Sequence, residues 1–382
     1  MQGITDRELR TRLIAINKSI RADRLPFGAT DNVVLRRFPT LAGNPRRLGE
    51  MYQFWFRTRG CTFDRAGQCS MCNYGVGPDI DPRFIGRALR WRMSVVPDNA
   101  FIYVSPSGSL LDPQEVPREL LHDVLAEAAR HKPLAFAFET RPELCSAEVF
   151  AKVHSMLPET TRVAIELGVE SWTPEIRRMC HLKPSPQAAY ENAVRLAREY
   201  GFDVIANLTL GGLGLTDAAA YADTIASVRG TREAGFSAQI VFPLSAKEGS
   251  LVGWAHGEGL WQPPTLWMLI RVLAECAAEG EATGHERDLD ISWYNPTLDD
   301  VLHSRPDCCA ACRPMVIEVL ERFRLEPNAA ALGPALAWRG CDCKEQADRR
   351  LRPTPEDERY RERLLEIVER SDATRRAGTG VG

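Results

Sequence analysis

The chain has 382 residues, of which 44% are hydrophobic and 26% charged, and its formal net charge is −3 at pH 7. These values are typical of a soluble globular protein that can bury a sizeable core, as one large α/β domain with appendages or as two domains. No apolar run reaches the roughly 18 residues of a membrane span, and the charged start at Asp6, Arg7 and Glu8 is not that of a signal peptide. We therefore expect a cytoplasmic protein without a membrane partner.

The first 50 residues carry ten Arg or Lys against five Asp or Glu. A helix followed by a covering arm accounts for this segment, and a nucleic-acid contact through its positive charge is the alternative. We expect residues 1–50 to form such an N-terminal helical arm.

Six short apolar runs follow, separated by stretches with helical patterns such as residues 114–130 and 184–200. The runs lie at residues 51–56, 101–104, 134–138, 162–169, 204–210 and 238–242. Short apolar strands joined by helices indicate a parallel sheet, because parallel strands need crossover connections. The sequence therefore predicts an α/β fold, a partial, TIM-like (β/α)6 barrel over residues 51–290. Its active site is expected at the rim where the strands end.

Three cysteines, Cys61, Cys69 and Cys72, follow the first predicted strand. Three thiolates are one short of the four that normally hold an iron-sulfur cluster, so a cubane here keeps one iron open for a reacting ligand. Zinc with a distant histidine is the alternative that the spacing alone leaves open. The position directly after the first strand favours a cluster, because Gly60 and Gly67 let the loop fold round one at little steric cost.

A second group of cysteines lies in residues 291–345, which we expect to form an auxiliary cluster region. It consists of Cys309, Cys312, Cys341 and Cys343. Two pairs with gaps of two and one residues suit either a second 4Fe-4S cluster or a tetrahedral zinc ion. The neighbouring thiol of Cys308 leaves the number of ligands open. Residues 346–382 are expected to form a solvated helix near 355–371 and a frayed tail.

The first cysteine group resembles that of the radical S-adenosylmethionine (SAM) superfamily, whose barrel begins with a strand and a three-cysteine loop. The gap between the first two cysteines is usually three residues there and is seven here, and Met71 replaces the usual aromatic residue. A subgroup of the superfamily has such a lengthened loop. The segments 139–143 and 166–171 are similar to strand motifs of the elongator catalytic subunit family.

Further motifs resemble the radical SAM subunit of archaeosine synthase. Its relatives have a Ser-Gly-Ser turn after the second strand, which matches residues 107–109. They also have a Gly-Ser or Gly-Thr pair followed by Pro-Pro-x-Leu-Trp, which matches residues 249–250 and 263–267. Two cysteine pairs follow in these relatives, the first with two intervening residues and the second with one, in the same order as in this chain.

The resemblance implies that Cys61, Cys69 and Cys72 hold a catalytic 4Fe-4S cluster to which S-adenosylmethionine binds. It also implies cofactor contacts at the strand ends, by Ser107, Gly108, Ser109, Glu139, Arg141, Glu166 and Arg178. Each has a simpler alternative. The turn at 107–109 can be an ordinary strand-end turn, Glu139 and Arg141 can pair with each other, Glu166 can face either side of its strand, and Arg178 can belong to a solvated helix start.

Such an enzyme produces a 5'-deoxyadenosyl radical, which removes a hydrogen atom from its substrate, and it needs an electron donor such as flavodoxin or ferredoxin. A net charge of −3 lacks the footprint of a tRNA-binding protein, so we favour a small-molecule substrate, in particular a nucleoside in a biosynthetic pathway. Sulfur insertion from the second cluster is the narrowest hypothesis. The alternatives are a radical lyase or rearrangement on a modified tRNA base, and a non-enzymatic zinc protein that binds a partner.

Overall fold

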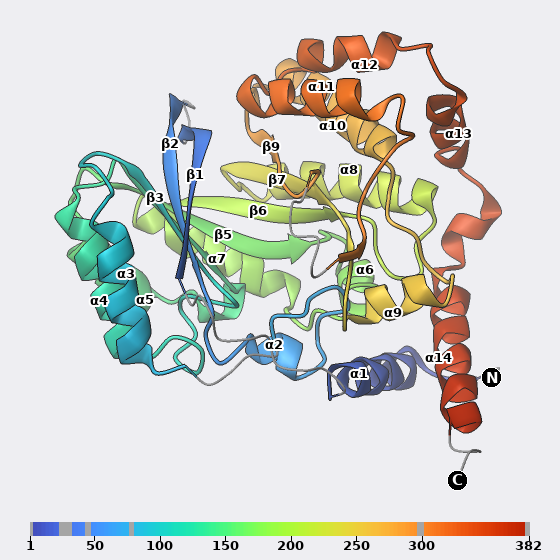
Figure 1. Cartoon of the computed structure of the whole chain (residues 1–382), viewed down its shortest axis with the longest axis horizontal. Helices are drawn as coiled ribbons and strands as arrows, with labels where there is room; N and C mark the ends of the chain where they lie inside the picture. The colour runs from blue at the N-terminus through green and yellow to red at the C-terminus, as the bar shows by residue number, and fades with distance from the viewer. Residues whose placement is uncertain (1–2, 23–32, 43–46, 76–79, 296–301, 379–382) are drawn as a thin grey trace.

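The computed structural model describes residues 3–22, 33–42, 47–75, 80–295 and 302–378. The main feature is one eight-stranded sheet in the order β1-β2-β3-β4-β5-β6-β7-β9. All neighbouring pairs are parallel except β1 and β2. The sheet curls into an open half-barrel (Figure 1), as the sequence predicted.

All six predicted strands are present and occupy the middle of the sheet in chain order. They are β2 (Arg47–Phe56), β3 (Phe101–Pro106), β4 (Ala135–Thr140), β5 (Arg162–Glu170), β6 (Asp203–Leu210) and β7 (Ala238–Pro243). The sequence analysis missed both edge strands. One is β1 (Val33–Ala42), which extends the sheet from within the expected covering arm, and the other is the short β9 (Leu289–Ile291). A small second sheet pairs β8 (Ala246–Lys247) with β10 (Leu302–Ser304).

Helices form the crossovers between the strands and cover the outer face of the sheet (Figure 1). They are α3 (Pro82–Met93), α4 (Arg118–Arg130), α5 (Ala147–Met156), α6 (Pro174–Met179), α7 (Gln187–Glu199), α8 (Asp217–Glu233) and α10 (Leu266–Thr283). The C-terminal part adds α11 (Arg313–Leu325), α12 (Gly333–Ala337), α13 (Asp342–Arg350) and α14 (Tyr360–Gly378), with 3-10 turns at Pro142–Leu144, Ala329–Leu332 and Pro355–Glu358.

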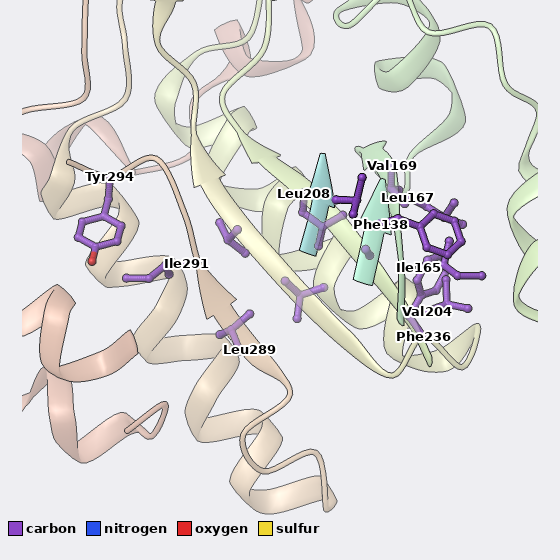
Figure 2. Close-up of a cluster of buried hydrophobic side chains, with 14 of the residues drawn as sticks. Phe138, Ile165, Leu167, Val169, Val204, Leu208, Phe236, Leu289, Ile291 and Tyr294 are labelled. Carbon is purple, nitrogen blue, oxygen red and sulfur yellow. The ribbon is translucent and has the colours of Figure 1, made fainter. Parts of the chain in front are cut away.

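The strands alternate between a face that packs against these helices and a face that lines the barrel interior. In β6, Val204, Ala206 and Leu208 are buried in the main core, while Ile205 and Asn207 are half-buried on the opposite face. Figure 2 shows how the core continues from Phe138, Leu167 and Leu208 to the side chains of β9. This period of two is what one buried face of a strand requires.

A second hydrophobic core joins the two ends of the chain to the cysteine loop. It contains Leu13 of α1 (Asp6–Ala22), Met71 of the loop, Val252 of α9 (Leu251–Gly257) and Ile367 of α14. Helices α1 and α14 lie side by side near both termini (Figure 1). The N-terminal helix thus packs directly on the cysteine loop. In the part of the chain that the structure describes, no helix is both long and apolar enough to cross a membrane.

Candidate functional site

The first cysteine loop begins at the carboxyl end of β2, the first parallel strand. Cys61 precedes the short helix α2 (Thr62–Arg65), and its backbone N–H donates to the carbonyl of Tyr74 at 3.2 Å, which closes the loop. Gly60 has φ +95°, and a Cβ there would lie 2.7 Å from the Tyr74 carbonyl oxygen. Glycine is therefore required both for the backbone conformation and for the close approach.

The structure brings two of the three cysteines together and leaves the third slightly apart. Ligand atoms of Cys69, Cys72 and Asp64 lie within 4.8 Å of one another. The Sγ of Cys61 instead accepts a hydrogen bond from Arg141 Nη1 at 3.7 Å. Burial, followed by the charges of Glu115 and Cys72, raises the pKa of Cys61 to about 12. Without a metal the thiol of Cys61 stays protonated, and metal binding there must release its proton.

Hydrogen bonds from distant elements hold the middle of this loop. Ser70 donates from its backbone to the His181 carbonyl at 3.1 Å and from its hydroxyl to the Cys180 carbonyl at 2.9 Å. Its own carbonyl accepts from Val252 N at 2.9 Å. Asn17 of α1 donates to the carbonyls of Gly67 at 2.9 Å and Cys69 at 2.8 Å. Sequence reasoning missed Asn17, because nothing in a helix marks one polar residue as the partner of carbonyls 50 residues away.

The predicted Ser107-Gly108-Ser109 turn lies next to this loop, but its hydroxyls already have protein partners. Ser107 Oγ accepts from Thr58 N at 2.9 Å, and Ser109 Oγ lies 2.7 Å from the hydroxyl of Thr140. Ser109 N donates to the buried Glu115 at 2.6 Å. A cofactor at this turn would find backbone groups rather than free hydroxyls. The cofactor contact of residues 107–109 remains a prediction.

Arg141 lies between the turn and the cysteine loop and pairs with two acidic residues of the loop after β3, while its Nε lies 3.5 Å from Glu143. It donates to Glu115 at 2.7 Å and to Asp112, and its guanidinium lies 4.5 Å from the ring centroid of Phe63. Because both carboxylates belong to the loop after β3, Arg141 holds that loop against Cys61. The expected alternative, an ion pair between Arg141 and Glu139, is wrong, since Glu139 has other partners.

Glu139 and Glu166 face each other inside the barrel, on neighbouring strands. The hydroxyl of Tyr103 contacts both carboxylates, at 2.9 Å for Glu166, and Asn207 Nδ2 donates to Glu166 at 3.2 Å. Burial and the charge of Glu139 raise the pKa of Glu166 to about 8. Since one phenol proton cannot satisfy two carboxylates, we infer that the pair holds one additional proton at neutral pH. The sequence left open which face of β5 carries Glu166, and the structure places this side chain on the interior face.

The basic residues after β5 divide between the interior and the surface. Lys183 forms an ion pair with the buried Glu170 at 2.6 Å. Arg178 instead lies on the outer side of α6, 3.9 Å from Asp6 of α1. The predicted cofactor contact of Arg178 stays a prediction. Lys183 is the basic group that this segment places near the cysteine loop, because its charge interacts with that of Cys69.

The four C-terminal cysteines form a compact group, as predicted. All four sulfur atoms lie within 4.8 Å of one another, and the pairs Cys309–Cys341 and Cys312–Cys343 are separated by 3.4 and 3.5 Å. Cys309 and Cys312 precede the first turn of α11, Cys341 is the N-cap of α13, and Cys343 lies in the first turn of α13. Trp267 Nε1 donates to Cys343 at 3.1 Å.

This spacing bears on which metal the four cysteines bind. A tetrahedral zinc ion with Zn–S bonds of about 2.3 Å holds its sulfur atoms about 3.8 Å apart. A cubane is wider, so its thiolates lie farther from one another. The side-chain arrangement fits one tetrahedral ion directly and fits a cubane only if the two pairs move apart. Cys308 is not in the group of four.

No family model matches the chain. Archaeosine synthase subunit beta of Methanosarcina acetivorans is 26% identical over 297 residues, which cover 76% of this chain and 82% of the relative. An uncharacterised protein of Methanocaldococcus jannaschii is 26% identical over 318 residues, covering 78% of this chain and 80% of the relative.

Solved structures similar to this fold include an Elp3 of Methanocaldococcus infernus with an N-terminal deletion and a methylornithine synthase. The Elp3 structure has a TM-score of 0.47 and 16% identity, covering 63% of this chain and 61% of the other. The methylornithine synthase structure also has a TM-score of 0.47 and 16% identity, covering 88% of this chain and 98% of the other.

Proposed function

We propose that the chain, which is similar to archaeosine synthase subunit beta, is a radical SAM enzyme, and that its Cys61, Cys69 and Cys72 hold a 4Fe-4S cluster that cleaves S-adenosylmethionine. A bound cluster supplies the electron that breaks a carbon–sulfur bond of the cofactor, giving methionine and the 5'-deoxyadenosyl radical. A flavodoxin or ferredoxin is the expected source of that electron. The radical then abstracts a hydrogen atom from the substrate.

One observation carries this proposal: the loop with three cysteines lies at the carboxyl end of the first parallel strand of an open half-barrel. Three thiolates fit a cubane that keeps one iron open, which is the position that a chelating cofactor needs. Tyr103, Ala137 and Ala164 form a small cluster of buried side chains on three neighbouring strands of this sheet.

For the substrate, we propose a small molecule, with a nucleoside as the favoured class. The carboxyl and phenol groups of Glu139, Glu166 and Tyr103 converge inside the barrel and offer both donors and acceptors to sugar hydroxyls. The net charge of −3 supports this choice over a tRNA. A radical lyase or rearrangement on a tRNA base is the second candidate, favoured by the name of the relative from Methanosarcina acetivorans.

The narrower proposal is sulfur insertion from a second cluster at the C-terminal cysteines. A cluster held by these cysteines would supply a sulfide to a substrate carbon radical and would take up the electron released as the carbon–sulfur bond forms. This step requires a sulfide-bearing cluster at Cys309, Cys312, Cys341 and Cys343. A zinc ion there, which the sulfur spacing fits directly, would have no sulfide to give.

Iron, acid-labile sulfide and zinc content of protein purified and reconstituted without oxygen tests these proposals together. About eight irons per chain fits two cubanes, and about four irons with one zinc fits a single cubane at the first site. The second result would contradict the proposal of sulfur insertion but would agree with the proposal of a radical enzyme. Absence of iron would leave only the zinc-binding interaction protein. Co-purification of tRNA in a salt-sensitive complex would contradict the small-molecule proposal.

A further inference from the structure

Helix α3 carries a row of large apolar side chains on its exposed side. Its inner side packs into the main core through Leu89 and Met93. On the outer side Phe84 is 47% exposed, Trp91 is 67% exposed, and Val95, just after the helix, is 53% exposed. Their spacing of seven and four residues places them along one side of a helix. Single exposed apolar residues are ordinary, whereas a row of them indicates an interaction surface.

The same side of α3 is positively charged. All four charged residues of the helix are arginines, at positions 83, 87, 90 and 92. Arg90 lies 3.8 Å from Asp123 of α4, and the guanidinium of Arg92 lies 4.6 Å from the ring centroid of Trp91. Arg83 and Arg87 are exposed and form no ion pair with the residues that the structure describes.

This combination of residues is that of an interface rather than of a solvated helix. We call Arg83, Phe84, Arg87, Trp91 and Val95 the α3 face. Tryptophan, phenylalanine and arginine are enriched where proteins bind one another, and tryptophan and arginine supply most of the residues on which the affinity depends. A solvated helix instead mixes acidic with basic residues, and α3 has no acidic residue.

The surface of the cysteine loop has the same positive sign. In residues 57–75 the exposed side chains are those of Arg59 and Arg65, while Asp64, the one acidic residue of this segment, is buried. Residues 57–93 together carry seven Arg against three Asp, in a chain whose net charge is −3. The positive charge is thus concentrated on the cysteine loop and α3, where it can attract an acidic partner.

Helix α3 and the cysteine loop are close enough for one partner to contact both. Asp81, the N-cap of α3, follows Gly75 by six residues, and a segment of that length spans at most about 21 Å. Tyr74, next to Gly75, closes the loop on Cys61 through its carbonyl. A folded protein of about 100 residues has a radius of gyration of about 13 Å, so its diameter exceeds this gap.

We propose that the α3 face, together with Arg59 and Arg65, is the docking surface for the electron donor, a small acidic electron-transfer protein. This inference rests on the proposed function, since a cluster at the cysteine loop must receive an electron before it can act. The step transfers one electron from the donor and neither makes nor breaks a covalent bond. Acidic groups of the donor complement the arginines, while Phe84 and Trp91 supply the apolar centre. Interfaces of electron-transfer proteins are small, so a surface of this extent suffices.

The test compares wild type with Trp91→Ser and Arg87→Glu on the α3 face. The matched controls, Leu325→Ser and Arg322→Glu, make similar changes at exposed positions of α11. One arm measures the dissociation constants of a flavodoxin and a ferredoxin at low ionic strength, and their change with salt. The other measures by stopped-flow absorbance how fast the reduced flavodoxin, or dithionite, reduces the reconstituted protein. Electron paramagnetic resonance (EPR) after dithionite reduction shows whether each variant holds its cluster.

Both variants of the α3 face should weaken donor binding about tenfold or more, the loss expected when a central interface residue is removed or its charge reversed. Reduction by flavodoxin should slow to a similar extent, whereas reduction by dithionite, which needs no docking surface, should keep its wild-type rate. Arg87→Glu should also make binding less sensitive to salt. Both controls should behave as wild type.

Wild-type affinity and wild-type reduction by flavodoxin in both variants would overturn the proposal. Absence of donor binding by wild type at low ionic strength would overturn it as well. Loss of tRNA binding in the two variants, with donor binding unchanged, would instead identify the α3 face as an RNA-binding surface. Failure of the proposed function has a different signature, because dithionite would then give wild type no EPR signal while donor binding could still be measured.

Discussion

Replacing Asn17 of helix α1 with leucine should disturb the cysteine loop, because the Asn17 side chain is hydrogen-bonded to that loop. Asn17 is fully buried, with an exposed fraction of 0%. Its Nδ2 donates to the carbonyls of Gly67 at 2.9 Å and Cys69 at 2.8 Å, and its Oδ1 accepts from Leu251 N at 3.1 Å. One side chain thus joins α1, the cysteine loop and the first turn of α9.

Asn17→Leu keeps a side chain of similar size and leaves these three backbone groups without their partner. A buried polar group without a partner costs about 1–3 kcal/mol, and carbonyls tolerate the loss better than N–H groups. We therefore expect a loss of about 3–6 kcal/mol in the free energy of unfolding. Asn17→Asp keeps the acceptor for Leu251 but puts a carboxylate against two carbonyl oxygens, so it should also destabilise.

Urea unfolding gives the stability, and EPR of the reconstituted protein gives the state of the first cluster. Asn192→Leu is the matched control, because Asn192 is an exposed asparagine of helix α7, and it should change stability by less than about 0.5 kcal/mol. Full stability of Asn17→Leu would refute the energetic argument. Lost stability with an unchanged cluster signal would refute the inference that α1 positions the loop.

Three further predictions concern single groups around the two sites. Gly108→Ala should abolish cofactor cleavage, measured as 5'-deoxyadenosine release. The new Cβ would lie 1.9 Å from Glu115 Oε2, and the backbone there has φ +147°. Normal turnover would contradict the close contact. Glu166 has a pKa raised to about 8 by burial, so it binds more protons folded than unfolded, and stability should fall as pH rises from about 4.5 to about 8. Urea unfolding across this range should show a flatter pH dependence for Glu166→Gln, and an identical profile would argue against a neutral Glu166. Trp267→Phe removes the N–H donor to Cys343 and should speed metal loss to a chelator about 10- to 100-fold, whereas an unchanged rate would show that this hydrogen bond is unimportant for the metal.

The sequence predicted the middle of the fold well, because the six parallel strands are short apolar runs separated by helical patterns. The edges were missed for physical reasons. β9 has only three residues, and β1 lies in a segment whose charges suggested an arm. Edge strands carry less of the buried face that makes a strand visible in a sequence.

The grouping of the four C-terminal cysteines was also predictable, since each pair is local in the chain, whereas the role of either cysteine group as metal ligands stays a prediction. The side chains that complete the sites were not predictable, because their partners are distant in the chain. Asn17 meets the carbonyls of Gly67 and Cys69 only through the fold. The sequence offered an ion pair between Glu139 and Arg141 as an alternative, but β4 ends at Thr140, between the two residues. Beyond that point the period of two no longer applies, and Arg141 turns to the loop after β3.

The most direct test of the account is 5'-deoxyadenosine release from S-adenosylmethionine by anaerobically reconstituted protein with a chemical reductant. We predict release by wild type and by Cys276→Ala, which changes a buried cysteine of α10 outside both metal groups. Cys61→Ala should give none, because two thiolates do not hold the cluster in a reactive state. Equal release by Cys61→Ala and wild type would contradict the central claim that the first three cysteines carry the reaction.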